Sequence, residues 1–549
     1  MSDVRDPIED ARRIADIERA ASNNDIPRAV EMARAALADG LAHPLLLNLR
    51  SFWWSQQGRY GQALEDLKLA VSMAPNDLFV RNAYGMLLCR LERWREAIAF
   101  LRETVSMAPS YAIGQFALGT ALERTGELDE ARRHYETALA LDPNFVKPMV
   151  HLADLAQRRS DRETAKALAE RALNLDPNNY AALTALAVVA VTEGEIDRAE
   201  HLVTPLLGRT PDDPQEASMA RRVMGDIRHA QGRYAQAFAA YKQSNRQKYE
   251  VFASRFETPG STATDYCHWL STYFETADPA AWSAKRQTAP DDGRDGATGH
   301  VFLVGFPRSG TTLLENVLAS HPEVVTLEEK DTFGNLTHDF LIDEAGRQQL
   351  AALSDAEIET HRAAYWSRVR GFGAQVAGKL FVDKYPLTSL KLPMVAKLFP
   401  KARVLFALRD PRDVVLSCYR RSFAMNSSMF EFLDIARAAR FYDAVMTLCT
   451  TYREKLELDW RPTRNEALVD DFEGEARAIC KFIGLEWNAQ MNDFAQHAMS
   501  RTIRTPSSVQ VVKGINREGV GVWRHYREEM APALDTLQHW VETYGYDRA

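Results

Sequence analysis

The first half of the chain repeats one pattern of apolar and polar residues. Residues 58–75, GRYGQALEDLKLAVSMAP, and residues 126–143, GELDEARRHYETALALDP, place apolar residues three and four positions apart, which predicts amphipathic helices. Each helix ends at a proline. Three series of residues share a step of 34 along the chain. They are Ala29, Ala63, Ala97, Ala131, Ala165 and Ala199; Pro75, Pro109, Pro143, Pro177 and Pro211; and the turn-like Gly58, Glu92, Gly126, Ser160 and Gly194.

A 34-residue period with small residues at helix contacts and a proline near the end of each unit resembles the tetratricopeptide repeat. The alanines let two helices approach closely, and Tyr60, Trp94 and Tyr135 are expected to fill the gaps between neighbours. A further unit around Ala237 is displaced by an insertion, which brings the count to six or seven. Residues 1–245 are therefore predicted to form an α-solenoid, whose concave surface is expected to bind a protein or peptide.

Residues 246–298 are less regular and are interpreted as a connector. Residues 255–275, RFETPGSTATDYCHWLSTYFE, predict a turn followed by a helix. Residues 284–300, AKRQTAPDDGRDGATGH, are polar and rich in Gly, Asp and Pro, which predicts an exposed linker between two domains.

The composition of the chain excludes several classes of protein but does not indicate a particular function. The 549 residues are 46% hydrophobic and 26% charged, which excludes a mostly disordered chain. A formal net charge of −8 argues against binding nucleic acid or an anionic membrane by bulk charge. No stretch approaches the roughly 20 apolar residues of a membrane span, and the charged start, which has no apolar run, predicts that no signal peptide is present. The scattered Cys89, Cys267, Cys418, Cys449 and Cys480 are expected to be reduced and mostly buried, as in a cytoplasmic protein.

The second half begins with a strand, a glycine turn and a helix. Residues 301–304 are a short apolar run, and the turn Gly305–Thr312 reads GFPRSGTT. Such a turn holds phosphate on backbone N–H groups and a positive helix end. It fits the triphosphate-binding pattern G-x-x-x-x-G-K-[ST], except that Thr311 replaces the lysine. ATP or GTP hydrolysis becomes a poor fit, while Arg308 offers a cation for another anion. A plain glycine turn opening an ordinary helix is the alternative.

Residues 307–324, PRSGTTLLENVLASHPEV, resemble the sulfotransferase family, and its tyrosylprotein branch in particular. The resemblance covers residues 299–549 and implies an α/β domain with a mainly parallel sheet. It also implies 3′-phosphoadenosine 5′-phosphosulfate (PAPS) as co-substrate and no metal. By resemblance, the 5′-phosphosulfate would be held by the residues of the turn, which are Arg308, Ser309, Gly310, Thr311 and Thr312.

A second motif, residues 402–423, reads ARVLFALRDPRDVVLSCYRRSF and predicts a strand followed by a helix. The resemblance places Arg409 and Ser417 on the 3′-phosphate of the nucleotide, and a guanidinium with a hydroxyl suits a dianion. A surface ion pair of Arg409 with Asp410 or Asp413 is the alternative. Asp410 is expected to cap the helix rather than to act in catalysis.

The resemblance also implies the residues that would carry the reaction. Glu329 occupies the position of the general base, and Lys384 that of the lysine on the oxygen that leaves with the nucleotide. Arg308 joins them as a catalytic candidate. His321 is a competing base, although its place after a helix favours a helix-end role. In the last segment Ser507 matches a PAPS-contacting serine, and Trp523 is interpreted as core packing.

Three positions depart from the pattern of the tyrosylprotein branch. Asn465 stands in place of a nucleotide-contacting tyrosine, and Val522 in place of a lysine. Asp331 stands in place of an arginine that faces acidic peptides, which puts a preference for acidic substrates in doubt.

The sequence therefore predicts a solenoid joined to a PAPS-dependent sulfotransferase that acts on an acceptor hydroxyl. Protein or peptide tyrosine presented with the help of the repeats is the first candidate acceptor, and glycan or lipid hydroxyls are alternatives. An interaction scaffold with an inactive nucleotide-binding domain is the rival from another class. Neither nucleic acid nor a membrane span is expected, and a homodimer stays open.

Overall fold

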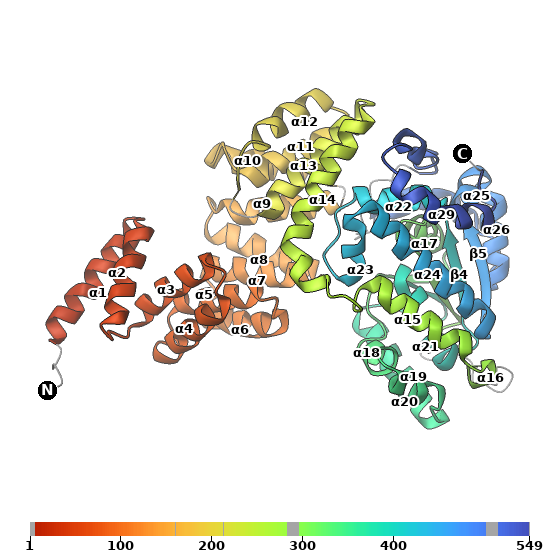
Figure 1. Ribbon diagram of the computed structural model, residues 1–549, viewed down its shortest axis with the longest axis horizontal. Helices are drawn as coiled ribbons and strands as arrows, with labels where there is room; N and C mark the ends of the chain where they lie inside the picture. Colours follow the sequence, from red (N-terminus) through yellow and green to blue (C-terminus); the bar gives the residue numbers. More distant parts are fainter. Residues whose placement is uncertain (1–5, 160, 212–213, 283–295, 501–513, 548–549) are drawn as a thin grey trace. The chain divides into compact units, whose positions relative to one another are not determined.

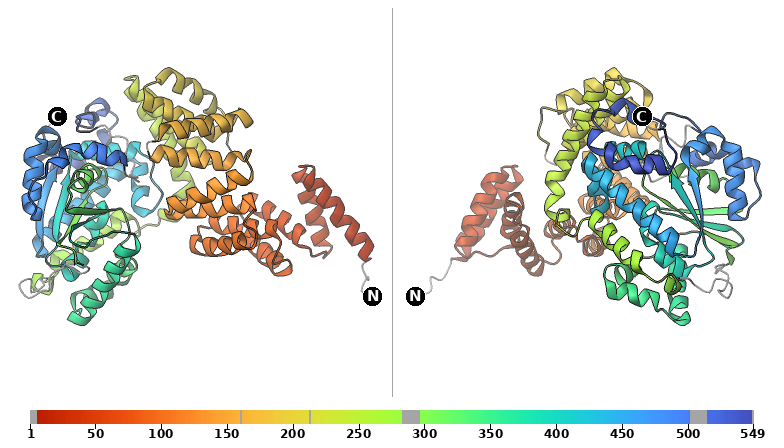
Figure 2. Two further views of the ribbon diagram at one scale, coloured as in Figure 1. Left: turned by 180° about the vertical axis from the view of Figure 1, so that it is seen from behind. Right: turned by 45° about the vertical axis from the view of Figure 1, so that its right-hand side comes forward.

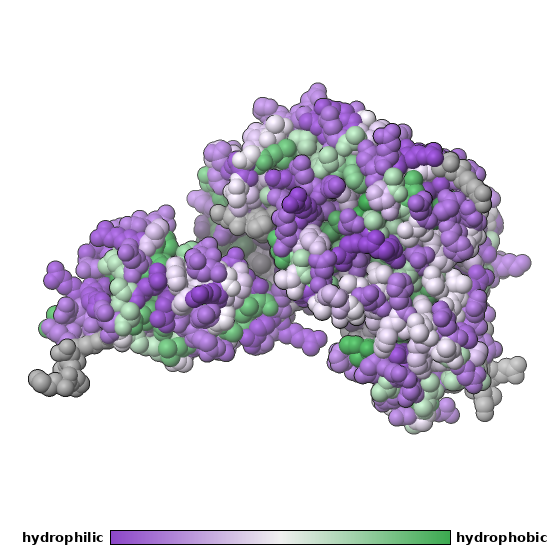
Figure 3. Space-filling model, in the orientation of Figure 1, coloured by the Kyte–Doolittle hydropathy of each residue, from purple (hydrophilic) through white to green (hydrophobic). Residues whose placement is uncertain are grey.

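The computed structural model describes residues 6–159, 161–211, 214–282, 296–500 and 514–547 (Figure 1). The chain forms two compact units. One contains residues 1–156 and 163–185, and the other contains residues 157–162 and 186–549. Among the described residues, no helix combines the length and hydropathy that crossing a membrane requires. The face in Figure 3 is mostly hydrophilic, with hydrophobic residues in small scattered patches.

Antiparallel helix pairs build the first unit. Its helices are α1 (Pro7–Ser22), α2 (Ile26–Ala38), α3 (Pro44–Gln56), α4 (Tyr60–Met73), α5 (Leu78–Arg90), α6 (Trp94–Met107), α7 (Ala112–Thr125), α8 (Leu128–Leu141), α9 (Val146–Arg158) and α10 (Arg162–Leu175), and α11 (Tyr180–Glu193) spans its boundary. The alanines of the 34-residue series are completely buried. Gly58 and Gly126 take left-handed φ angles of 70° and 89° at the turns, and Glu92 takes 56° at the equivalent turn. The predicted solenoid of repeats is confirmed.

The repeats continue into the second unit. There α12 (Ile196–Val203) is followed by a 3₁₀ turn (Thr204–Leu206), by α13 (Pro214–Ala230) and by α14 (Tyr234–Phe256). Ala237 on α14 is fully buried, as in the earlier repeats. Helices α15 (Ala263–Thr276) and α16 (Pro279–Trp282) come next, and most of the expected linker lies outside the described residues.

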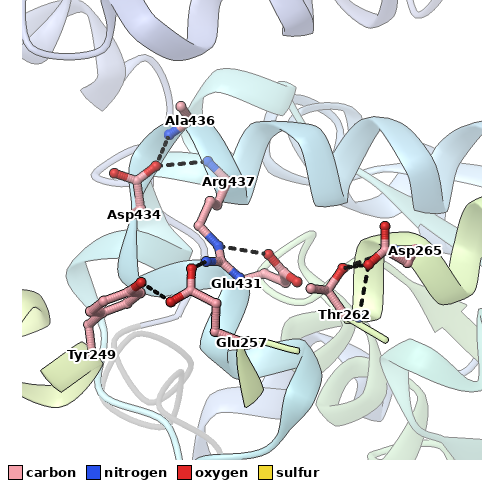
Figure 4. A network of polar contacts seen from close by, with 8 residues as sticks. All are labelled: Tyr249, Glu257, Thr262, Asp265, Glu431, Asp434, Ala436 and Arg437. Atoms are coloured by element: carbon pink, nitrogen blue, oxygen red, sulfur yellow. Dashed lines mark hydrogen bonds and ion pairs between the residues drawn. The ribbon is translucent and has the colours of Figure 1, made fainter. Parts of the chain in front are cut away.

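The turn between α14 and α15 is held by a network of polar contacts (Figure 4). Arg437 bridges two carboxylates, with Nη1 2.8 Å from Oε1 of Glu257 and Nε 3.2 Å from Oε2 of Glu431. The Tyr249 hydroxyl on α14 donates to Glu257. Thr262 opens α15 with a capping box, in which its hydroxyl oxygen accepts from the Asp265 N–H. The end of α14 is thereby fixed to the helical layer of the second unit.

The core of the second unit is a five-stranded parallel sheet (Figure 2). Its strands are β1 (Gly299–Gly305), β2 (Val324–Glu328), β3 (Leu380–Lys384), β4 (Arg403–Leu408) and β5 (Asp459–Arg464), and their order is β2-β3-β1-β4-β5. In register, Leu303 lies opposite Lys384, and Gly305 lies opposite Ala407. Because the strands are parallel, all their carboxyl ends meet at one edge. Adjacent β1 and β4 send their connections in opposite directions, which is where α/β sheets bind ligands.

Alternate strand residues point to two separate cores, so helices cover both faces of the sheet. Val301, Leu303 and Val382 pack with α17 (Thr311–Ala319), α26 (Phe472–Ile483) and α27 (Phe494–Ser500). Phe302, Val304 and Phe381 face α21 (Leu392–Leu398), α22 (Pro411–Arg420) and α24 (Ile435–Lys455). The remaining α-helices are α18 (Leu336–Leu341), α19 (Glu344–Ala351), α20 (Asp355–Gly371), α23 (Ser427–Phe430), α25 (Asn465–Asp470) and α29 (Ala531–Thr543). The predicted α/β domain with a parallel sheet is confirmed.

All five cysteines are free and buried, as the sequence predicts. Burial raises the pKa of the Cys480 thiol to about 11 and the pKa of the Cys89 thiol to about 12.

Candidate active site

Two glycines shape the turn between β1 and α17. At Gly305, φ is 152°, and a Cβ atom would lie 2.6 Å from the backbone oxygen of Ala407 on the neighbouring strand. At Gly310, φ is 96°, and a Cβ would lie 2.5 Å from Oδ1 of Asn465. A side chain is therefore excluded at both positions by φ and by space. Between them Arg308 takes a φ of 70°, a strained angle for a residue with a side chain.

The turn brings Arg308 against the helix that follows β4. Arg308 is 8% exposed, and its Nε donates to Oγ of Ser417 at 3.0 Å. Nη1 of Arg409 donates to the backbone oxygen of Arg308 at 3.1 Å, and Nη2 donates to the backbone oxygen of Gly519. The structure thus brings together three of the residues predicted to bind the donor, although they lie 101 and 109 positions apart in sequence.

Arg421 is a candidate that the sequence analysis did not single out. Burial, and then the positive charges of Arg421 and Arg409, lower the pKa of Arg308 to about 9. The guanidinium groups of Arg409 and Arg421, which are half-buried, therefore repel that of the buried Arg308, and a bound anion would relieve that repulsion. Arg421 is the C-cap residue of α22 and follows Ser417 by four residues, so the basic pair at the end of the predicted helix is the signal that could have identified it.

Lys384 is completely buried at the end of β3 among three carboxylates. Its Nζ lies 3.1 Å from Oε1 of Glu329, 3.3 Å from Oε1 of Glu328 and 3.4 Å from Oε2 of Glu315. Burial by itself would lower the pKa of Lys384, but the carboxylates outweigh it and raise the pKa above its ordinary value. The lysine is therefore held in its charged form.

Glu329 is the most exposed of these three carboxylates. Its side chain is 37% exposed, against 11% for Glu328 and 2% for Glu315. Its N–H donates to the backbone oxygen of Lys384 at 2.7 Å, and its φ is 45°. The two residues predicted to carry the reaction are therefore in direct contact, with one carboxylate oxygen turned toward the ammonium.

A buried polar chain on the opposite face of β3 holds the loop that begins at Glu329. Oδ2 of Asp383 accepts from the Thr332 hydroxyl at 2.7 Å and from the Tyr365 hydroxyl at 2.6 Å. Tyr365 also lies 3.0 Å from Nε2 of His300 on β1. Burial raises the pKa of Asp383 to about 6, and the two hydroxyl donors lower it in part. Thr332 is three positions after Glu329, so this chain fixes the loop that bears the candidate base.

The raised pKa of Asp383 predicts a pH-dependent contribution to stability. The folded state binds this proton more tightly than the unfolded state, so the contribution is greatest at low pH and is lost as pH rises from about 4 to about 6. We expect a loss of about 2–3 kcal/mol over that window, which Asp383→Asn removes. Thermal unfolding of both proteins across the window measures it. The exposed Asp339→Asn is the control, and parallel pH profiles of wild type and Asp383→Asn would contradict the assignment.

Four other residues were singled out in the sequence, and the structure describes three of them, His321, Asp410 and Trp523. His321 is buried after α17, where Nδ1 accepts from the Glu323 N–H at 3.1 Å and Nε2 lies 2.9 Å from the Glu486 backbone oxygen. Both ring nitrogens are thus used locally. Asp410 caps α22 through the Arg412 N–H, as predicted, and Trp523 is buried beneath the Arg412 guanidinium. Ser507 lies outside the described residues.

Fold and site define an α/β domain whose charged side chains meet at the carboxyl edge of a parallel sheet. Residues 300–489 match the family model described as the sulfotransferase family, and residues 112–145 and 156–222 match models of the tetratricopeptide repeat. The chain therefore joins tetratricopeptide repeats to a sulfotransferase-family domain.

Several curated proteins are similar to this chain. An uncharacterized protein of Aquifex aeolicus is 26% identical over 43% of this chain and 32% of its own length. Protein-tyrosine sulfotransferase A of Caenorhabditis elegans is 26% identical over 47% of this chain and 70% of its own. Protein-tyrosine sulfotransferase 1 of Danio rerio is 25% identical over 41% of this chain and 65% of its own length.

Proposed function

We propose that this protein transfers a sulfuryl group from PAPS to an acceptor hydroxyl. The observation that carries the proposal is the contact between the buried ammonium of Lys384 and the exposed carboxylate of Glu329 beside the glycine turn. A cation and a base placed together in this way suit a reaction that transfers a group from an anionic donor to a hydroxyl. The matching family model and the tyrosine sulfotransferase relatives support the same reaction.

The residues around the turn fit a nucleotide that carries two anionic groups. The buried Arg308 and the half-buried Arg409 and Arg421 form a cationic group, and Nε of Arg409 is a buried donor without a hydrogen-bond partner among the described residues. A buried N–H of this kind is stabilised by an acceptor from a ligand. Arg409 and Ser417 would hold the 3′-phosphate. The 5′-phosphosulfate would lie on the turn, against the first N–H groups of α17, which have no partners within the helix.

Glu329 would act as the general base, and Lys384 would stabilise the leaving oxygen. As the acceptor oxygen attacks sulfur, Glu329 takes the hydroxyl proton, and the bond from sulfur to the nucleotide oxygen breaks. Negative charge develops on that oxygen, where an N–H of Lys384 stabilises it. The ammonium has three N–H donors and three carboxylate neighbours. The hydrogen bonds from Nζ go to Glu328 at 3.3 Å and to Glu329 at 3.1 Å. Contact with the leaving oxygen would compete with these two carboxylates, of which Glu329 is the more exposed.

The Glu329→Gln variant tests the role of the base. We expect turnover with PAPS to fall by about 10²–10⁴-fold, because the amide cannot accept the hydroxyl proton. PAP, the desulfonated product, should still bind within about twofold of wild type by calorimetry, because the residues around the turn are unchanged. The exposed Glu323→Gln, before β2, is the matched control. Turnover of Glu329→Gln within about threefold of wild type would remove Glu329 from the mechanism.

We further propose a protein or peptide tyrosine as the acceptor, which the repeats would help to present. The relatives named protein-tyrosine sulfotransferases support tyrosine. Asp331, two residues after Glu329, has a side chain that is 59% exposed, and it pairs with Lys391 at 3.3 Å. Even with Lys391 as its partner, a carboxylate beside the base offers no cation to acidic residues of an acceptor, so we infer that neutral or basic acceptor sequences are favoured. Transfer from labelled PAPS to tyrosine peptides of each charge, and to glycan and lipid hydroxyls, decides between the acceptors. Absence of transfer to all of them would favour the scaffold alternative.

A further inference from the structure

The last repeat hairpin, α13–α14, packs directly on the helix that carries Ser417 and Arg421. Phe238 on α14 stacks on Tyr419 of α22, with ring centroids 5.0 Å apart. Tyr234 stacks on His525 at 4.4 Å, and Nδ1 of His229 lies 2.8 Å from the Tyr526 hydroxyl. These residues all belong to the second compact unit. The hairpin is therefore a layer of the sulfotransferase-family domain as well as the end of the repeats.

Two polar side chains of α14 hold the end of α22. Nδ2 of the buried Asn245 donates to the backbone oxygen of Tyr419 at 3.0 Å. Nζ of Lys248 donates to Oγ of Ser422 at 2.5 Å. The last carbonyl groups of a helix have no partner within the helix, so a buried donor from outside stabilises its end. The segment fixed between these two contacts, residues 419–422, contains Arg421 and follows Ser417.

A half-buried pair of charges from the same hairpin lies near that segment. Asp226 on α13 accepts from the Tyr241 hydroxyl at 2.8 Å and pairs with Arg222 at 2.8 Å. The Arg420 guanidinium lies over the ring of Tyr241 at 5.3 Å and over the ring of Tyr526 at 5.5 Å. The repeats thus supply a negative charge, on Asp226, and one aromatic face, that of Tyr241, for the arginine next to Arg421.

We propose that Asn245 and Lys248 of the last repeat are positioning residues for the donor site, acting through the end of α22 on Ser417 and Arg421. The inference rests on the proposed function, because that function places Ser417 on the 3′-phosphate and Arg421 in the same group of arginines as Arg308 and Arg409. The repeats then contribute to donor affinity as well as to any partner binding. The sulfotransferase-family model matches residues 300–489 only, so this contribution lies outside the matched region.

The test compares PAP with 5′-AMP, which lacks the 3′-phosphate, by calorimetry on the full chain. Asn245→Leu removes the donor to Tyr419 at nearly constant volume, and Ser422→Ala removes the partner of Lys248 without touching α14. We expect PAP binding to weaken about fivefold to tenfold in Asn245→Leu and less in Ser422→Ala. Binding of 5′-AMP should change less than twofold, because only the 3′-phosphate contacts are displaced.

Ser218→Ala is the matched control. Its hydroxyl is also buried in the same hairpin, and it makes its hydrogen bonds to Ser244 on α14, 2.9 Å from Oγ and 3.1 Å from the backbone oxygen. Weakened PAP binding in Ser218→Ala, equal losses for PAP and 5′-AMP, or unchanged PAP binding in both test variants would each overturn the inference. If Asn245→Leu fails to fold, Ser422→Ala decides alone. If wild type does not bind PAP, the proposed function fails first and the inference falls with it.

Discussion

Replacing Lys384 with methionine is expected to abolish sulfuryl transfer and to destabilise the second unit by about 3–5 kcal/mol. Three carboxylates lose their shared cation, and two of them, Glu315 and Glu328, have side chains only 2% and 11% exposed. Protonation removes their charge, so the loss should be smaller near pH 5 than near pH 8. Calorimetric unfolding of wild type and variant at both pH values measures the difference.

Lys391→Met is the matched control for this prediction. Lys391 is a nearby lysine whose one ion pair among the described residues is with the exposed Asp331 at 3.3 Å, and such a pair contributes at most about 1 kcal/mol. Lys384→Arg keeps the charge and should recover part of the stability but not the activity. An equal loss of stability for Lys384→Met at the two pH values would contradict the account, because uncompensated carboxylates must respond to protons.

Deleting residues 1–245 is expected to prevent the rest of the chain from folding, whereas deleting residues 1–178 is not. The longer deletion removes α13 and the first half of α14, and exposes the buried rings of Tyr419 and Tyr526. It also removes the Tyr241 ring from Arg420. The shorter deletion removes most of the first unit and leaves the second unit nearly whole. Soluble yield, gel filtration and calorimetry with PAP compare the two products.

The same pair of truncations separates folding from delivery of the acceptor. If the protein lacking residues 1–178 binds PAP but loses transfer to peptides, the first unit presents the acceptor. If it transfers as well as the full chain, the proposed delivery role is wrong. A soluble, PAP-binding product after deletion of residues 1–245 would contradict the structural role assigned to α13–α14.

Periodicity carried most of the fold prediction. The alanines of the 34-residue series could be placed at helix contacts because the same small residue recurs at the same position of every repeat. Each of these alanines is buried in the structure. The end of the repeats was harder to interpret. Helix α14 continues to Phe256, and its Phe238 ring packs against Tyr419 and Tyr526, which lie more than 180 positions later in the sequence. An amphipathic pattern shows that a face is buried but does not say what covers it.

The site was predictable where its chemistry lies in a short motif. The turn around Gly305 and Gly310 could be identified because left-handed φ angles and close backbone approach require glycine. The contact of Lys384 with Glu315 and Glu328 was not predicted, since it depends on the register of β2 on β3 and on a helix face. Asp383 was missed for the same reason, because its hydroxyl partners come from two other elements.

Because every cysteine is buried, the rate at which each thiol reacts with an alkylating reagent reports local unfolding around it. Cys89 lies in the first unit, whereas Cys267, Cys418, Cys449 and Cys480 lie in the second. Only a solvent-exposed thiolate reacts with an alkylating reagent, and burial raises the pKa of each thiol. The labelling rate at Cys89 therefore follows local unfolding of the repeats, and the rate at Cys418 follows loosening of the helix beside the glycine turn.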